Sequence, residues 1–375
     1  MKHTVKPVAL ALALTMLCVT APPPFDAAAT ARAVRAVVGG PVLGVLARVG
    51  GDARWTATAG RAEADRPRPV PANARFRIGS ITKTFVATVV LSLVAEGEIT
   101  LDDPIQRHLP GVLPADYPPI TVRQLLRHTS GIPNYRPSVM STPETVVRDR
   151  FRRWRPEELI RIATAQPRLF EPDAGQSYAN TNYILLGLLI KKITHRSWQR
   201  EVTERLIKPL GLTATSAPRT DPKVPTPHAH AYVTLTRDGA TRLVDVTRIS
   251  PSAVDAAGAM ISTSHDLDVF LHALLTGRLL PEPLLAEMLR PFPGGSVGGA
   301  GYGLGMMTVT LPPACGGQTL YGHGGGTFGY SSLVLATRDA RRRFTISANT
   351  TALDEANSPV EKLLAAARTA FCGGT

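Results

Sequence analysis

The strand signals of this 375-residue chain lie at its two ends. After a helical segment at residues 31–38, residues 42–49 and 54–58 predict a hairpin. The other strand-like segments are residues 304–311, 318–321, 330–337 and 343–349, before a closing helix at residues 358–370. Because sheet strands must share hydrogen bonds, we expect the two ends of the chain to pair in one antiparallel sheet.

The middle of the chain has a mostly helical pattern, broken by proline-rich loops. Helical segments are predicted at residues 121–128, 156–165, 181–193 and 198–206. We therefore predict an α+β fold, in which an antiparallel sheet flanked by helices carries an inserted all-α lobe. The expected division is an α/β lobe of residues 30–79 and 256–375 and a helical lobe of residues 80–255. The cleft between them is the expected active site of one catalytic unit.

An export signal is predicted at the N-terminus. Two lysines precede an apolar run at residues 8–19 and small residues at 27–31, which is typical of a secretory signal peptide. We predict a signal peptide at residues 1–29, cleaved near residues 29–31, and a secreted protein. The run is short for a membrane span, and no later stretch approaches the roughly 20 apolar residues that a spanning helix needs.

The chain is strongly basic, with a formal net charge of +13. Nucleic acid is a common partner of such proteins, but export argues against it and favours acidic cell-wall polymers or membrane surfaces. The basic run at residues 148–155 could grip an anionic polymer, although a solvated helix start is the commoner reading. We expect a monomer that has no nucleic-acid partner.

Cysteine usage predicts one disulfide. Cys18 falls in the predicted signal peptide, where the bulky Leu17 before it disfavours lipid modification, so Cys315 and Cys372 remain as a pair in an oxidising compartment. Closing a loop of about 58 residues would stabilise the fold by roughly 4 kcal/mol.

Ser80 and Lys83 carry the strongest chemical signal. Residues three apart share a helix face, so an amine would lie beside a hydroxyl at the start of an apolar helix that runs from residue 80 to 94 and stops at Gly97. In the first turn, free N–H groups and the helix dipole stabilise developing negative charge. This pattern indicates a nucleophilic serine activated for acyl transfer.

Two further motifs could complete such a site. Tyr178 and Asn180 lie two apart in an extended loop, so a phenol and an amide would face the same way, the first to relay a proton and the second to fix an amine and a substrate carbonyl. Around His323, the glycines at residues 322–329 let another backbone or a ligand approach closely, and free N–H groups there could form an oxyanion hole.

Other site types fit poorly. Gly324-x-Gly326-x-x-Gly329 matches a dinucleotide fingerprint, but a strand follows it where that motif needs a helix. Gly294-Gly295-Ser296-Val297-Gly298 matches an α/β-hydrolase elbow, but it precedes His323-Gly324-Gly325-Gly326, the reverse of that fold's order. His228 and His230 are isolated in a proline-rich loop, so we predict no metal and no cofactor.

Taken in order, Ser80-x-x-Lys83, Tyr178-x-Asn180 and His323-x-Gly325 resemble the three motifs of the serine β-lactamase and DD-peptidase superfamily, in its class C β-lactamase-like branch. The likeness extends over connecting segments such as residues 121–131, 258–263 and 301–305. Within the superfamily the chain is most similar to the secreted actinomycete D-alanyl-D-alanine carboxypeptidases. The resemblance implies a β-lactamase/transpeptidase-like fold, and the Cys315–Cys372 pair would reproduce their disulfide pattern.

The resemblance also implies a role for each residue. Ser80 would attack an acyl carbonyl, Lys83 and Tyr178 would move its proton, and Asn180 would orient Lys83 and the substrate. The backbone N–H groups of Ser80 and Gly326, beside Gly325, would hold the oxyanion, and His323 would support the proton relay electrostatically.

Two departures concern the substrate. Gly324 stands where the carboxypeptidases have a hydroxyl residue, and Met306 or Met307 stands where they have an arginine that faces the substrate's carboxylate. A methionine cannot make a charge-assisted hydrogen bond, so Arg136 or Arg248 would have to substitute.

The predicted function is an exported serine hydrolase that forms an acyl-enzyme on Ser80, first as a D-alanyl-D-alanine carboxypeptidase-like enzyme acting on cell-wall peptides. An esterase, an amidase, a D-aminopeptidase or a β-lactamase would use the same machinery on small peptides, esters or β-lactams. A non-catalytic module that binds penicillin or peptidoglycan is the alternative of another class.

Overall fold

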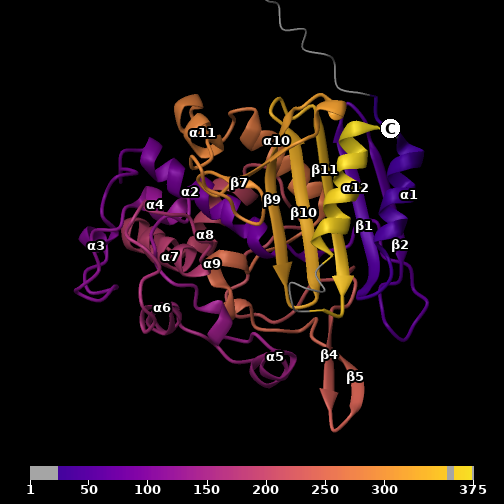
Figure 1. Ribbon diagram of the computed structural model, residues 1–375, viewed down its shortest axis with the longest axis horizontal. Coiled ribbons are helices and arrows are strands. Elements are labelled where there is room, and N and C mark those ends of the chain that lie inside the picture. The colour runs from indigo at the N-terminus through magenta and orange to yellow at the C-terminus, as the bar shows by residue number, and fades with distance from the viewer. Residues whose placement is uncertain (1–23, 353–358, 374–375) are drawn as a thin grey trace, which may run out of the picture.

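The computed structural model describes residues 24–352 and 359–373, and its centre is a seven-stranded sheet (Figure 1). The strand order is β2-β1-β11-β10-β9-β8-β7, with every neighbouring pair antiparallel. The strands are β1 Val42–Gly51, β2 Trp55–Gly60, β7 Gly301–Tyr302, β8 Met307–Thr310, β9 Thr319–Thr327, β10 Tyr330–Thr337 and β11 Arg342–Thr350. Strand β1 pairs with β11, with Leu46 opposite Ser347, so the two ends of the chain share one sheet as the sequence predicts.

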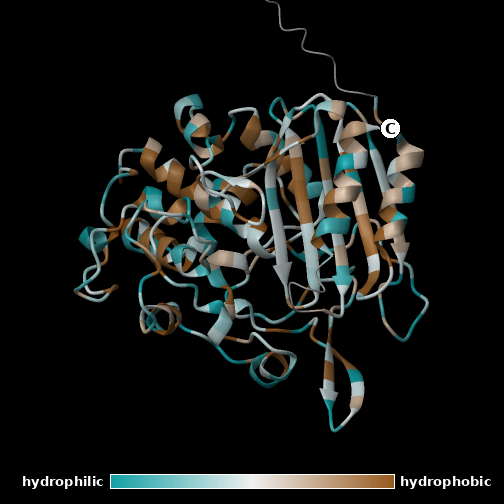
Figure 2. Cartoon of the chain, in the orientation of Figure 1, coloured by the Kyte–Doolittle hydropathy of each residue, from teal (hydrophilic) through white to brown (hydrophobic). Residues whose placement is uncertain are grey.

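Helices cover both faces of this sheet. Helices α1 (Ala27–Val37) and α12 (Val360–Cys372) lie side by side across one face, and α10 (Ser264–Leu275) packs on the other. Side chains alternate between the two faces, so Leu333 and Leu335 of β10 join the cluster under α1 and α12, whereas Val334 between them joins the other core. Figure 2 shows the apolar residues along β10 and β1.

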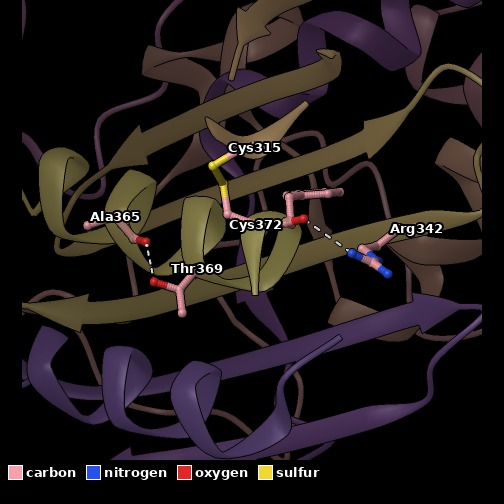
Figure 3. Close-up of a disulfide and its surroundings, with 6 residues drawn as sticks. Cys315, Arg342, Ala365, Thr369 and Cys372 are labelled. Atoms are coloured by element: carbon pink, nitrogen blue, oxygen red, sulfur yellow. Dashed lines mark hydrogen bonds between the residues drawn. A yellow bond between two sulfur atoms is a disulfide. The ribbon is translucent and has the colours of Figure 1, made fainter. Parts of the chain in front are cut away.

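A disulfide joins Cys315 and Cys372, the pair that the sequence predicts (Figure 3). Cys315 ends a short 3₁₀ turn, Pro313–Cys315, between β8 and β9, and Cys372 is the last residue of α12. The guanidinium of Arg342 on β11 also donates to the carbonyl of Phe371 at 3.2 Å. The C-terminal helix is therefore anchored to the sheet at its end.

The helical part of the molecule surrounds two long, buried helices, α2 (Thr82–Ala95) and α7 (Asn180–Thr194). Helix α2 is buried on nearly all sides and is followed by Gly97 at φ +76°, the left-handed stop that the sequence predicts. Its Phe85 stacks on Phe270 of α10 with ring centroids 3.6 Å apart, which fixes α2 against the sheet layer. The shorter helices are α3 Ile105–His108, α4 Val122–Leu126, α5 Pro143–Asp149, α6 Pro156–Thr164, α8 Trp198–Val202, α9 Asp255–Gly258 and α11 Glu282–Leu289.

Several predicted elements differ from the structure. A hairpin of β4 (Tyr232–Arg237) and β5 (Ala240–Asp245) projects from the region predicted to be all helical. Its turn uses Asp238 at φ +51° and Gly239 at φ +76°, an Asp-Gly pair that favours hairpins. The prediction of strands and one closing helix after residue 255 is also incomplete, because α10 and α11 lie there.

Smaller differences concern element ends. The strand predicted at residues 304–311 spans only Met307–Thr310, because Gly305 adopts φ +79° just before it. The helix predicted at residues 198–206 ends at Val202 and continues as a π-helical turn, Thr203–Ile207. The two-residue strands β3 (Phe76–Arg77) and β6 (Ile261–Ser262) form a separate ladder, and β3 leads into the turn Gly79–Ile81 that carries Ser80, called the nucleophile turn below.

Most of the predicted signal peptide, residues 1–29, lies outside the described residues. Helix α1 begins at Ala27, with the carboxylate of Asp26 accepting from the N–H of Ala29 at 2.8 Å. Among the helices of residues 24–352 and 359–373, none is both long and apolar enough to cross a bilayer. The division of the chain at residues 80 and 255 stays a prediction.

Candidate active site

Ser80 lies in a 3₁₀ turn, Gly79–Ile81, that leads directly into α2. The sequence predicts an α-helix that begins at residue 80, but the helix begins two residues later, at Thr82, so Ser80 lies in the 3₁₀ turn before it. Gly79 has φ +51°, and a Cβ placed on it would lie 2.8 Å from the backbone nitrogen of Gly326 on β9. Only glycine allows the nucleophile turn to approach β9 so closely. Ser80 itself is half-buried and therefore reachable by a substrate.

The amine of Lys83 is completely buried and touches three oxygens. Its Nζ lies 3.1 Å from Ser80 Oγ, 2.7 Å from Asn180 Oδ1 and 2.7 Å from the carbonyl oxygen of Ala257. Burial lowers the pKa of Lys83 well below its usual value, and the charge of Arg136 lowers it further. In its neutral form this amine would have two N–H groups for the two carbonyl oxygens, and its lone pair would face the Ser80 hydroxyl.

Tyr178 lies beside this amine, with its ring centroid 4.7 Å from Lys83 Nζ. Its hydroxyl is buried and makes no well-formed hydrogen bond within the described part of the chain. Burial raises the pKa of Tyr178, while the nearby Ser80 hydroxyl opposes this rise. The phenol is therefore protonated at neutral pH and has a free O–H next to the nucleophile.

His323 is buried on β9 and is held on both ring nitrogens. Its Nδ1 donates to the carbonyl of Gly324 at 2.5 Å, and the hydroxyl of Tyr302 donates to Nε2 at 2.9 Å. Burial and the nearby Lys83 lower the pKa of His323 to about 3. The imidazole is thus neutral at neutral pH, so its electrostatic influence on the site is that of a dipole.

The glycines of β9 line the open side of the nucleophile turn. A Cβ on Gly325 would lie 2.0 Å from the carbonyl oxygen of Ile78, so this residue is in direct backbone contact with the turn. Gly326 is exposed, and the space at its Cβ position is empty for 4 Å. The backbone of Gly326 is thus accessible next to Ser80, where the sequence predicts an oxyanion hole.

Sequence reasoning assigned no role to Tyr302, His128 or Asn134, which support the site. His128 Nδ1 accepts from the N–H of Ala179 at 3.3 Å, and its ring centroid lies 4.3 Å from that of Tyr178. Asn134 Oδ1 accepts from the N–H of Asn180 at 3.2 Å. His128 and Tyr302 lie in segments on which the family resemblance rests, but no motif pointed to their contacts.

Met306 and Met307 are the two candidates for the position where the carboxypeptidases have an arginine. Met306 is buried, whereas the Sδ of Met307 accepts from the N–H of Gly324 at 3.4 Å, so this thioether lies against β9. Arg136 donates to the carbonyls of Val139 and Met140, and its guanidinium lies 5.5 Å from the ring centroid of Phe328. Arg248 lines a separate cavity.

Residues that could hold a metal ion do not come together here. Within residues 24–352 and 359–373, no group of three histidine, cysteine or acidic side chains has a metal-binding arrangement. His230 pairs instead with Asp245, Nδ1 to Oδ2 at 2.6 Å.

Ser80, Lys83, Tyr178 and His323 thus lie together between strand β9 of the sheet and the buried helix α2, and the comparisons identify the family of the chain. Residues 30–368 match the family model described as Beta-lactamase. The chain belongs to this family, and it is a serine hydrolase of the β-lactamase and penicillin-binding protein type.

Individual relatives refine this placement. A D-stereospecific amidohydrolase from a Streptomyces species is 40% identical, with a TM-score of 0.82 over 93% of this chain and 100% of that one. The D-amino acid amidase of Ochrobactrum anthropi SV3, complexed with D-phenylalanine, is 28% identical, with a TM-score of 0.75 over 91% and 98% of the two chains. A penicillin-binding protein of Bacillus subtilis (strain 168) is 26% identical over 323 residues, 81% of this chain and 67% of the relative. The chain spans only about a third of the length of other curated relatives, 31–32%.

Proposed function

We propose that this protein is a serine amidohydrolase that cleaves an amide or peptide bond at the carbonyl of a D-amino acid residue through an acyl-enzyme on Ser80. The observation that carries the proposal is the geometry of Lys83. Two carbonyl oxygens at 2.7 Å occupy the N–H groups of a neutral amine, and the remaining contact is Ser80 Oγ at 3.1 Å. A general base aimed at a serine hydroxyl is what acylation requires.

Acylation then follows from the contacts. Lys83 Nζ takes the proton of Ser80 as Oγ bonds to the substrate's carbonyl carbon. The N–H groups of Ser80 and Gly326 receive the oxyanion, at the closest approach of the nucleophile turn to β9. The C–N bond breaks as the free hydroxyl of Tyr178 gives its proton to the leaving nitrogen, and Lys83 returns a proton to the phenolate.

Deacylation uses the same groups in reverse. Water adds to the ester carbonyl, its proton passes to the Lys83 and Tyr178 pair, and the Ser80 Oγ–C bond breaks with return of a proton to Oγ. His323 stays neutral throughout, because a proton on its ring would be buried next to the Lys83 amine. Its hydrogen bonds keep Gly324 and Tyr302 in place.

Met307 favours substrates without a terminal carboxylate over those of a carboxypeptidase. Its thioether offers no charge-assisted contact to a terminal carboxylate, which a carboxypeptidase substrate presents. An amide or peptide without that carboxylate at the leaving group loses nothing by this replacement. The 40% identity to a D-stereospecific amidohydrolase and the likeness to a D-amino acid amidase support the same choice.

A D-alanyl-D-alanine carboxypeptidase is the second candidate, and Arg136 is the observation that favours it. This arginine makes no ion pair within the described residues, and its positive charge lowers the pKa of Lys83, so it acts on the site. In that case Arg136 would receive the terminal carboxylate that Met307 cannot bind.

Hydrolysis of four substrates separates these functions. We expect Ser80-dependent release of ammonia from D-phenylalanine amide, at least tenfold faster than from L-phenylalanine amide. If only the acyl-D-Ala-D-Ala peptide is cleaved, with release of D-alanine, the result would favour the carboxypeptidase. If only p-nitrophenyl acetate is hydrolysed, the result would favour an esterase. Absence of turnover in all four, with intact penicillin binding, would favour a non-catalytic module.

We also propose that the protein is exported and acts as a monomer. The charge pattern and small residues of the N-terminal segment support export. The capped helix α1 supports cleavage before Asp26, because cleavage at residues 29–31 would remove the cap and the first turn. The N-terminal sequence of the secreted protein tests export and the cleavage position, and its molar mass in solution tests the monomer.

A further inference from the structure

A positively charged cavity lies apart from the proposed catalytic residues. Its volume is about 950 Å³, and it is bordered by Ile261 of β6, on the ladder that precedes the nucleophile turn. Ser80, Lys83, Tyr178 and His323 do not line it. Three sequence features without a role in catalysis meet here: the basic run at residues 148–155, the histidines at 228 and 230, and Arg248.

Three cations face this cavity without an ion-pair partner. Arg150, Lys223 and Arg248 line it, and none of them makes a salt bridge within the described residues. The two carboxylates of the same lining are already engaged. Asp221 accepts from the backbone N–H of Lys223 at 3.0 Å, and Asp245 accepts from the N–H of Thr247 at 2.8 Å and pairs with His230.

A buried arginine holds the segments that carry these cations together. Arg77, only 3% exposed, donates to the carbonyls of Pro222 at 2.7 Å, Thr247 at 3.2 Å and Ile249 at 3.0 Å. Lys223 follows the first of these carbonyls, and Arg248 lies between the other two.

Arg150, the third cation, is connected to the segment that Arg77 holds at Ile249. The N–H of Ser250 donates to the carbonyl of Arg150 at 2.6 Å. Three segments, around residues 150, 223 and 248, therefore present three positive charges to one space, on a backbone network that is fixed by hydrogen bonds.

The cavity also offers apolar surface. Val224 and Ile261 are buried in its wall, and Phe151 is 54% exposed beside it, with the Arg150 guanidinium 5.0 Å from its ring centroid. An exposed aromatic next to cations that make no salt bridge within the described residues favours a ligand with a carbon skeleton as well as negative charge.

We propose that this cavity binds an organic anion that carries two or more carboxylate or phosphate charges next to an apolar part. The cations supply charge-assisted hydrogen bonds, and Phe151 with the apolar wall covers the carbon skeleton. The site is independent of the proposed reaction at Ser80.

Isothermal titration calorimetry of the secreted protein tests the proposal. Phenyl phosphate and isophthalate are the phosphate and carboxylate probes, and inorganic phosphate lacks the apolar part. We expect one site per chain for at least one organic probe, at least tenfold tighter than inorganic phosphate, and at least tenfold weaker in 0.5 M NaCl than in 0.05 M. The probe that binds tighter identifies the anion class.

Matched charge variants locate the site. Binding should be at least tenfold weaker in the triple variant Arg150→Gln/Lys223→Gln/Arg248→Gln. The control variant Arg32→Gln/Lys191→Gln/Lys192→Gln removes the same amount of charge at three exposed cations elsewhere, and its affinity for the probe should be unchanged. The single variants Arg248→Gln and Arg248→Lys guard against misfolding of the triple variant, since this side chain is exposed. Absence of binding by the wild type, or equal weakening in both triple variants, would overturn the proposal.

Discussion

Lys83 Nζ and the carbonyl oxygen of Ala257 are 2.7 Å apart, although 174 residues separate them in the sequence. This contact joins the first turn of α2 to α9, and it uses one N–H group of the buried amine. Together with Asn180 Oδ1 it leaves Ser80 Oγ as the partner for the lone pair. The proposed chemistry depends on this arrangement, because a freely rotating amine would not be aimed at the serine.

Replacing Arg136 should change the pH dependence of catalysis. Its positive charge lowers the pKa of Lys83, after the larger effect of burial, so its removal should raise that pKa. The acid limb of kcat/KM reports deprotonation of Lys83 and should move to higher pH in Arg136→Met. Arg136→Lys should restore the wild-type profile, and Arg248→Met should not alter it. An acid limb that stays in place or moves to lower pH in Arg136→Met would contradict this electrostatic role.

Two glycines with similar backbone angles should respond differently to substitution. Gly79 (φ +51°) and Gly97 (φ +76°) are both left-handed, so alanine should cost each about 1–2 kcal/mol of folding free energy. Only the Gly79 Cβ meets a neighbour, the nitrogen of Gly326 at 2.8 Å, whereas nothing lies within 4 Å of the Gly97 position. Displacing β9 from Ser80 should lower kcat by about 10²-fold in Gly79→Ala alone. Urea unfolding and steady-state rates check both halves, and equal activity of the two variants would refute the close approach.

His323 should make the fold sensitive to acid. Burial, and then Lys83, lower its pKa from 6.5 to about 3, so between these pH values the unfolded chain binds a proton that the folded protein excludes. Its contribution to stability is therefore complete above pH 6.5 and decreases as the pH falls toward 3. His323→Asn should lose less unfolding free energy than the wild type between pH 6.5 and 4, measured by urea denaturation. His128 is present in both proteins and cancels from the difference, so parallel curves would show that His323 does not titrate on unfolding.

Removing the disulfide should lower stability and leave catalysis intact. Cys315 and Cys372 are 57 residues apart, and opening a loop of this size costs roughly 4 kcal/mol in the chain-entropy model. The bond lies at the end of α12, on the sheet face opposite the core that contains α2. Cys315→Ala/Cys372→Ala should unfold at lower urea concentration with an unchanged kcat at 25 °C. Loss of activity in a variant that remains folded would mean that the two faces of the sheet are coupled.

Short-range patterns predicted much of this fold and little of the detail around the site. The pairing of the two chain ends followed from alternating segments such as residues 330–337, because a strand with no local partner must find a distant one. The Asp238-Gly239 hairpin was not predicted although its turn signal is strong, because it lies in a part of the chain where most segments have a helical pattern. Helices α10 and α11 were not predicted; α10 is buried on most sides, so it lacks the broad polar face that makes a 3.6-residue period easy to recognise.

At the site, spacing predicted residues that share one turn or one loop. Ser80 with Lys83, and Tyr178 with Asn180, are such pairs, and the structure brings all four together. The contacts of Ala257, Tyr302 and Asn134 could not be predicted in this way, since each depends on how distant segments pack. The neutral state of His323 is likewise a result of burial, which no local pattern reports.

Covalent labelling of Ser80 tests the central claim most directly. The protein is treated with a fluorophosphonate, digested, and mapped by mass spectrometry, with Ser80→Ala, Lys83→Met and Ser296→Ala alongside the wild type. The account predicts one label, on the peptide that contains Ser80. This label should be absent from Ser80→Ala, form roughly 10³-fold more slowly in Lys83→Met, and form at the normal rate in Ser296→Ala. Labelling at Ser296, or labelling of Ser80 at an unchanged rate in Lys83→Met, would contradict it.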